Sequence, residues 1–195
     1  MKPPIPDHAG DPVTYSRCWT GPNMLTVLRL LLVPVFAVLL LADGGVSTRV
    51  WAAIVFLVAA GTDVVDGEWA RRSGRVTTFG KVADPIADKA LTGVALVLLS
   101  YLGELPWWVT LVILIREFGV TALRFWVIRH GVIPASRGGK AKTLAQNFAI
   151  LLFVLPIDIA WLRIAAMAVA VILTVITGLD YVVRALRLRS VGRNG

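Results

Sequence analysis

The chain alternates long apolar runs with short polar breaks that contain glycine or proline, a pattern that predicts helices joined by short connections. A transmembrane α-helix needs about 20 predominantly apolar residues, and several of the runs approach that length. We therefore expect an all-α integral membrane protein with about six transmembrane helices. The predicted helices cover residues 24–41, 50–65, a third segment that begins between 77 and 85 and ends near 102, then 106–128, 140–155 and 161–186.

The segments outside these helices divide the chain into one membrane domain and two tails. Residues 1–20 are polar and rich in proline, and they lack the order of a secretory signal, so we expect a flexible tail. Residues 21–187 form the predicted membrane domain, with Asn23 or Thr26 capping its first helix. Residues 188–195 form a basic C-terminal tail.

Glycine and proline mark the predicted connections between helices. Asp43, Gly44 and Gly45 indicate a turn after the first helix. Residues 71–78 are expected to connect the second helix to the third, and residues 131–139 to form a loop before the fifth.

Composition supports a membrane protein. Hydrophobic residues make up 57% of the chain, and the mean hydropathy is +0.76, far from that of an ordinary soluble domain. The formal net charge of +8 would suggest nucleic acid as a partner of a soluble protein, but here we expect anionic membrane lipids instead. The single cysteine, Cys18, excludes an internal disulfide.

Basic residues are distributed unevenly between the two ends of the predicted helices. Lysine and arginine in the turns after the first, third and fifth helices amount to Arg49 and Arg163 only. The positive-inside rule then places both termini on the cytoplasmic side. The tails and the two remaining connections contain many cations, among them Arg71, Arg72, Arg75, Lys81, Arg129, Arg137, Lys140, Lys142, Arg184, Arg187, Arg189 and Arg193.

The stretch from Gly61 to Ala90 carries an unusual density of acids between two apolar runs. At about 100° per residue, a helix through this stretch places Asp66, Gly67, Ala70 and Arg71 within about 80° of Asp63. Acids beside membrane spans mark sites rather than scaffold. A second set of positions, four residues apart and therefore stacked on one face, follows in the next helix: Gly80, Asp84 and Asp88.

Two carboxylates from each of two helices suit a hard divalent cation, and Mg²⁺ commonly works together with substrate phosphates. A polar loop that only separates two spans would need neither the helical register nor the small residues beside the acids. The spacing Asp-x-x-Asp-Gly-x-x-Ala-Arg, eight residues, then Gly-x-x-x-Asp-x-x-x-Asp resembles the signature of the CDP-alcohol phosphatidyltransferases, with every position filled.

This resemblance implies that the phosphatidyl group of a CDP-linked lipid is transferred to an alcohol and that CMP leaves. It implies that Asp63, Asp66 and Asp84 hold Mg²⁺ or Mn²⁺ against the pyrophosphate. Asp88 would join the metal shell and act as the base for the attacking hydroxyl. Glu68, which falls between motif positions together with Trp69, is expected to be interfacial.

The remaining motif positions are implied to bind the CDP-lipid. Gly67 and Ala70 leave room for the nucleotide, Arg71 suits a phosphate, and Gly80 lets the two helices approach. Thr26 is assigned to the same substrate by the resemblance. The resemblance also implies a homodimer. We expect it in the inner (plasma) membrane with the active site facing the cytoplasm, because the positive-inside rule places the acidic motif on the same side as both termini.

A looser set of phrases resembles the branch of the family that uses glycerol 3-phosphate, the phosphatidylglycerophosphate synthases. These are Pro22-Asn23 with Thr26 and Arg29, Arg116-Glu117 with Arg124, and Gly139 to Thr143 with Gln146. A cationic cluster at Arg124, Arg137, Lys140 and Lys142 would hold the acceptor phosphate, although ordinary positive-inside charge explains the same residues. Arg116 and Glu117 suit either a substrate contact or an ion pair between helices.

The sequence is also compatible with other functions. Within the family, the acceptor alcohol can be inositol phosphate, serine or phosphatidylglycerol, the last giving a cardiolipin synthase. Prenyl transferases also pair aspartate motifs, but they use Asp-Asp-x-x-Asp runs that this sequence lacks. A metal or proton transporter would carry acids on both sides of the membrane midplane, whereas these lie at one interface.

Overall fold

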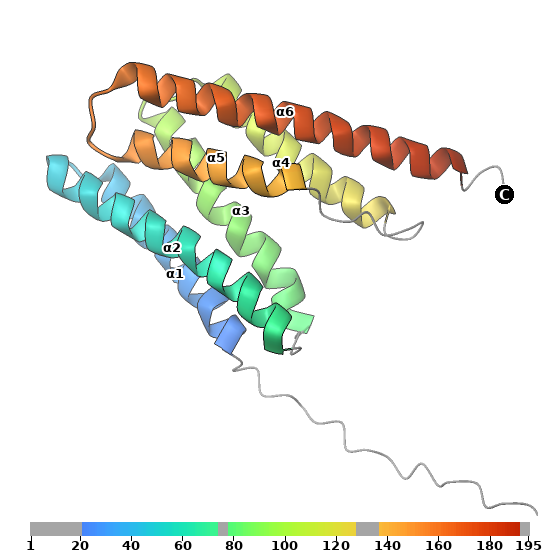
Figure 1. The fold of residues 1–195 in the computed structure, drawn as a ribbon. Helices are drawn as coiled ribbons and strands as arrows, with labels where there is room; N and C mark the ends of the chain where they lie inside the picture. Colours follow the sequence, from blue (N-terminus) through green and yellow to red (C-terminus); the bar gives the residue numbers. More distant parts are fainter. Residues whose placement is uncertain (1–20, 74–77, 128–136, 192–195) are drawn as a thin grey trace, which may run out of the picture.

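The computed structural model is all-helical over the residues that it describes, which are 21–73, 78–127 and 137–191, with side chains described over 27–62, 89–123 and 139–186. Six helices follow one another along this part of the chain (Figure 1). They are α1 (Gly21–Leu41), α2 (Gly45–Ser73), α3 (Thr78–Tyr101), α4 (Trp107–Val127), α5 (Arg137–Val154) and α6 (Ala160–Val191). The number of helices predicted from the apolar runs is therefore confirmed.

Several predicted helix ends were wrong. Helix α1 begins at Gly21, so Asn23 and Thr26 lie inside the helix and do not cap it, because a cap precedes the first helical residue. Helix α2 continues to Ser73, so the expected connection at 71–78 is shorter. Helix α5 begins at Arg137, within the expected loop. In each case the backbone helix extends into polar sequence that the hydrophobic pattern assigns to a connection.

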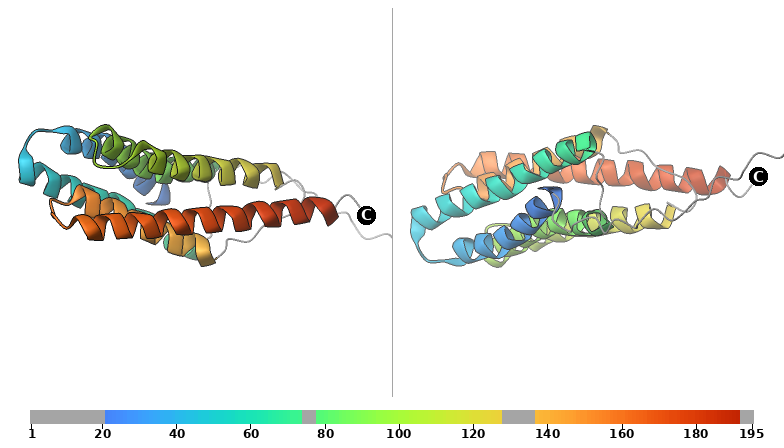
Figure 2. Two further views of the ribbon diagram at one scale, coloured as in Figure 1. Left: turned by 90° about the horizontal axis from the view of Figure 1, so that it is seen from above. Right: turned by 90° about the horizontal axis from the view of Figure 1, so that it is seen from below.

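The helices form one bundle in which α1 packs on α2 and α3, while α6 packs on α4 and α5. Contacts of α5 with α2 and α3, and of α3 with α4, join the two groups. The α1–α2, α3–α4 and α5–α6 connections lie together at one end, which we call the connection end (Figure 2). Helix α2 ends and α3 begins at the other end of these two helices, which we call the aspartate end (Figure 1).

The core between the helices is apolar and tightly packed. The Phe36 and Phe56 rings lie 5.6 Å apart between α1 and α2. Leu96, Ile113 and Ile150 bring α3, α4 and α5 together and are fully buried. Burying such side chains contributes about 1.5–3 kcal/mol each in a water-soluble protein, but in a bilayer close packing itself is the main source of stability.

The outer surface of the bundle is also apolar. Helix α6 exposes Ile164, Ile172, Ile176 and Leu179, which a water-soluble protein would bury. Among the described residues, two segments are long and apolar enough to cross a membrane, and two shorter helical segments are also apolar. The long ones are Gly45–Thr62 and Ala160–Leu186, and the short ones are Val27–Leu41 and Lys89–Tyr101.

Polar side chains tie the helices together at the connection end. The predicted turn after α1 is confirmed, with Gly45 at a φ of 63° that favours glycine. Arg49 on α2 forms an ion pair with Glu104 between α3 and α4. The hydroxyl groups of Ser100 and Thr110 lie 2.7 Å apart in the interior, linking α3 to α4.

Candidate functional site

The backbone brings both halves of the acidic motif to the aspartate end. Asp63 and Asp66 lie on α2, ten and seven residues before its end at Ser73. Asp84 and Asp88 lie on α3, six and ten residues after its start at Thr78. At about 1.5 Å per residue, Asp63 and Asp88 are about 15 Å from the helix ends, and Asp66 and Asp84 about 10 Å. Since α2 and α3 contact each other, the four positions occur at matching levels of two adjacent helices.

All but one of the other predicted CDP-lipid positions fall on the same two helices. Gly67, Ala70 and Arg71 lie on α2, Gly80 lies on the first turn of α3, and Thr26 lies on α1. The side chains of all these residues, and of the four aspartates, are outside the described part of the structure. Their predicted roles therefore stay predictions.

Arg29 on α1 contacts α2 one turn before the first half of the acidic motif, and no role was predicted for it. Its side chain is buried, and its Nε donates a 3.2 Å hydrogen bond to the carbonyl of Ala59 on α2. The hydroxyl of Thr62 donates to the same carbonyl at 2.8 Å. Because Ala59 is one turn before Asp63, Arg29 anchors α1 to the turn of α2 from which the motif begins.

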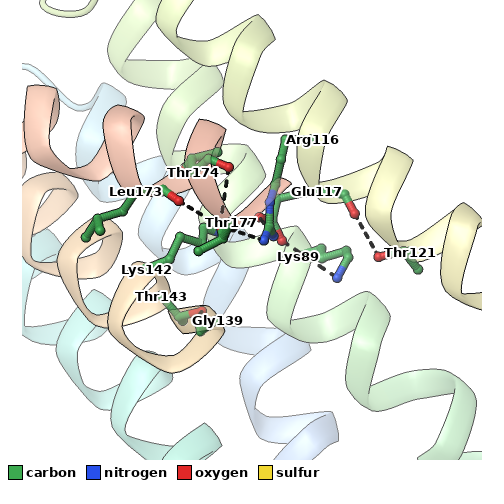
Figure 3. Close-up of polar contacts among 10 residues, drawn as sticks. All are labelled: Lys89, Arg116, Glu117, Thr121, Gly139, Lys142, Thr143, Leu173, Thr174 and Thr177. Atoms are coloured by element: carbon green, nitrogen blue, oxygen red, sulfur yellow. Dashed lines mark hydrogen bonds and ion pairs between the residues drawn. The ribbon is translucent and has the colours of Figure 1, made fainter. Parts of the chain in front are cut away.

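Glu117 on α4 lies at the centre of a cluster of charged side chains from three helices (Figure 3). Its carboxylate pairs with Lys142 on α5, with Arg116 at 3.0 Å, and with Lys89 on α3 at 3.9 Å. We call these four residues the Glu117 cluster. Lys89 directly follows Asp88 in the sequence, so the cluster is adjacent to the second half of the acidic motif.

Helix α6 joins the cluster through Arg116. The Arg116 guanidinium donates a 2.9 Å hydrogen bond to the hydroxyl of Thr177 (Figure 3). Gly178 allows this approach, since a Cβ added there would lie 3.0 Å from Cγ of Arg116. Three cations thus face one carboxylate among the described side chains, and the cluster has an excess of positive charge inside the bundle.

The four residues predicted to hold the acceptor phosphate have different surroundings. Lys142 is buried and paired with Glu117, so its charge already has a protein partner. Lys140 is exposed on the first turn of α5. Arg124, near the end of α4, and Arg137, the first residue of α5, have side chains outside the described part. Of the two alternatives for Glu117, a substrate contact or an ion pair between helices, the structure shows the ion pair, with Lys142 as the partner.

A small cavity of about 20 Å³ lies beside the Glu117 cluster, between α3, α4 and α5. It is lined by Lys89, Thr92, Glu117, Lys142 and Gln146, among others. This volume accommodates one water molecule or one hydroxyl group. The cavity therefore connects the charged cluster to Gln146, whose role the sequence did not indicate.

Comparison with known protein families agrees with the acidic motif on α2 and α3. The model of a family described as CDP-alcohol phosphatidyltransferase matches residues 19–176, which include α1 to α5 and the first half of α6. The chain belongs to the CDP-alcohol phosphatidyltransferase family. Members of this family generally use divalent metal ions, and the residue types at the four motif positions suit such ions.

Individual relatives of this phosphatidyltransferase cover most of its length. A Mycobacterium tuberculosis protein named "Probable phosphatidylglycerophosphate synthase" is 58% identical over 170 residues, which are 85% of this chain and 81% of the relative. The CDP-diacylglycerol–glycerol-3-phosphate 3-phosphatidyltransferase of Bacillus subtilis is 40% identical over 177 residues, covering 82% and 92%. The protein with that name from Salmonella paratyphi A is 38% identical over 168 residues, covering 82% and 91%.

Proposed function

We propose that this phosphatidyltransferase transfers the phosphatidyl group of CDP-diacylglycerol to glycerol 3-phosphate, giving phosphatidylglycerophosphate and CMP. The observation that carries the acceptor assignment is the cationic Glu117 cluster next to Asp88, because glycerol 3-phosphate brings a second phosphate that needs positive charge. The names of the relatives at 38–58% identity support the same acceptor.

The reaction is a displacement at phosphorus. A hydroxyl oxygen of the acceptor forms a bond to the phosphatidyl phosphorus, the bond from that phosphorus to the oxygen of CMP breaks, and CMP leaves. In this proposal Asp88 takes the proton of the attacking hydroxyl, as a general base. Arg71 binds a phosphate of the CDP-lipid, and Gly67 and Ala70 leave room beside it.

Four carboxylates at matching levels of two adjacent helices fit a divalent-metal site. We assign Asp63, Asp66, Asp84 and Asp88 as the residues that would hold Mg²⁺ or Mn²⁺. When bound, the metal neutralises the charge of the pyrophosphate and of the departing CMP. Arg29 supports the site by fixing the turn of α2 that precedes Asp63.

The acceptor phosphate is assigned to Arg124, Arg137, Lys140 and Lys142. Arg124 is seven residues after Glu117 on α4, so it lies on the same helical face, about 10 Å nearer the end of the helix. Lys140 and Lys142 lie in the first turns of α5. Lys142 is paired with Glu117, so it contributes as a member of a positively charged cluster that is already in place before the substrate binds.

The proposed enzyme crosses the inner membrane six times, with both termini and the aspartate end in the cytoplasm, and functions as a homodimer. Exposed aromatic residues at the connection end support a membrane interface there. They are Trp51, Tyr101, Trp107, Trp108 and Trp161. Arg49 and Arg163, which lie near the starts of α2 and α6 at this end, contact Glu104 and the carbonyl of Leu155 respectively.

Purified full-length protein in detergent, given CDP-diacylglycerol, tests the assignment directly. We expect CMP release with glycerol 3-phosphate and a product with the mass of phosphatidylglycerophosphate. The same assay with inositol phosphate, serine and phosphatidylglycerol provides the comparison. CMP release with one of these and not with glycerol 3-phosphate would contradict the acceptor while leaving the family unchanged.

A further inference from the structure

Gln146 on α5 is a buried amide without an explained role. Its side chain is 2% exposed, and among the described residues its Oε1 has no hydrogen-bond partner. Burying an unpaired amide oxygen is unfavourable, so a group that forms a hydrogen bond with this oxygen is expected to bind there. The missing partner has to be a hydrogen-bond donor, because a carbonyl oxygen only accepts.

The unpaired oxygen of Gln146 lies close to the proposed site of the reaction. Gln146 lines the 20 Å³ cavity together with Thr92 of α3 and the cluster residues Lys89 and Lys142. Position 92 follows position 88 by four residues, so the two stack on one face of α3, about 6 Å apart along the axis. The cavity is therefore about one helical turn from the position of the proposed base.

The surroundings define the chemistry of the group that fits. The cavity has room for one hydroxyl group but not for a whole acceptor molecule, and its wall carries Lys89 and Lys142 against the single carboxylate of Glu117, an excess of positive charge. A ligand that satisfies both features has a hydroxyl group close to an anionic group. Glycerol 3-phosphate has two hydroxyl groups, of which the primary one is the less hindered nucleophile and the secondary one stays free.

We infer that Gln146 accepts a hydrogen bond from the hydroxyl group of the acceptor that does not attack, and so selects an acceptor with a hydroxyl next to the reacting carbon. This inference rests on the proposed function, since it assumes glycerol 3-phosphate as the acceptor. It makes Gln146 a specificity-determining residue that touches the substrate, separate from the cations that hold the phosphate.

An acceptor that lacks only this hydroxyl, 3-hydroxypropyl phosphate, tests the inference. We expect wild-type protein to prefer glycerol 3-phosphate by about tenfold in kcat/KM, the scale of one neutral hydrogen bond. Gln146→Met keeps the unbranched length of the side chain but removes the amide, so the preference should fall to near one. Gln146→Glu keeps an acceptor oxygen and should retain the preference. Asn147→Leu removes the neighbouring amide on α5, which does not line the cavity, and should leave the preference unchanged.

The outcomes separate this inference from the proposed function. If Gln146→Met retains the full wild-type preference, a resident water satisfies the amide and the inference is wrong. No preference in the wild type would also overturn it. If the wild type ignores both acceptors but uses another alcohol, the acceptor assignment itself fails. Thermal melting of each variant in detergent shows that a change in preference comes from folded protein.

Discussion

Glu117 on α4 and Lys142 on α5 form an ion pair inside the bundle, although 25 residues separate them in the sequence. The pair fixes the first turns of α5 against α4, next to the proposed acceptor site. It also means that Lys142 is held by the protein before any substrate binds. A substitution at either residue therefore affects both the stability of the bundle and the acceptor.

A double-mutant cycle measures this coupling. We expect Glu117→Gln and Lys142→Met each to lower the free energy of unfolding by about 1–3 kcal/mol, because each removes one side of a buried ion pair. The double variant should cost less than the sum of the two, with a coupling of about 1 kcal/mol or more. Unfolding by sodium dodecyl sulfate in mixed micelles provides the measurement. Strictly additive costs would show that the pair contributes nothing beyond its separate members.

The close approach of α6 to Arg116 predicts opposite effects at two glycines. Gly178→Ala places a Cβ 3.0 Å from Cγ of Arg116, whose guanidinium is fixed by Glu117 and Thr177, so we expect a loss of about 1 kcal/mol. Gly119→Ala on α4 meets open space and should stabilise by about 0.5–1 kcal/mol, because alanine favours the helix. The melting temperatures of the two variants should move in opposite directions, and a rise for both would contradict the predicted crowding.

Removal of metal tests the aspartate site. Chelation with EDTA should abolish CMP release, and added Mg²⁺ or Mn²⁺ should restore it. The proposed carboxylates are themselves negative, so the metal has to supply the charge that neutralises the pyrophosphate. The rate of CMP release before and after metal addition is the measurement. Activity that survives thorough chelation would rule out the metal-dependent mechanism.

Substitutions at two aspartates separate the base from the metal ligands. Asp88→Asn removes the proton acceptor but keeps the size of the side chain, so turnover should fall by about 10²-fold or more, with CDP-diacylglycerol binding largely kept. Asp63→Asn should also weaken nucleotide binding, because its proposed role is to hold metal on the pyrophosphate. Turnover and equilibrium binding of CDP-diacylglycerol distinguish the two, and near-normal turnover of Asp88→Asn would remove it as the base.

The proposed phosphate site predicts a selective effect on one substrate. Arg124→Ala and Lys140→Ala should each raise the KM for glycerol 3-phosphate about ten- to a hundredfold, the effect of losing one charge-assisted contact worth about 1.5–3 kcal/mol. The KM for CDP-diacylglycerol should stay nearly constant. A matched rise in both constants would instead indicate that α4 or α5 has moved, and no change for either variant would return these cations to a role in membrane topology.

The fold could be predicted from the sequence to the extent that apolar runs and their breaks determine it. The turn at Gly45 and the six helices followed from this pattern, because glycine at positive φ and long apolar segments have local causes. The ends at Ser73 and Arg137 did not follow, since backbone hydrogen bonds continue the helix into residues whose polarity suggests a connection.

The candidate site could be predicted only where its residues are close in the sequence. The aspartate spacing placed four carboxylates on two helices, and the helices occur as expected. The contact between Arg29 and Ala59 and the cavity beside Gln146 could not be predicted, because they depend on how helices pack. Arg29 did carry one signal, as the single charge in the first apolar run.

The Glu117 cluster also affects how the protein is made. In the proposed six-span topology, Lys89, Arg116 and Lys142 enter the bilayer on three successive helices. A lysine or arginine at the centre of such a helix costs about 2.5–3.5 kcal/mol. Arg116 has the carboxylate of Glu117 beside it on its own helix. Lys89 reaches this carboxylate once α3 and α4 are both inserted, Lys142 reaches it once α5 follows, and Thr177 completes the contacts from α6. Insertion of the last four helices is therefore interdependent, and a nascent chain that stops before α5 lacks Lys142, the buried partner of Glu117.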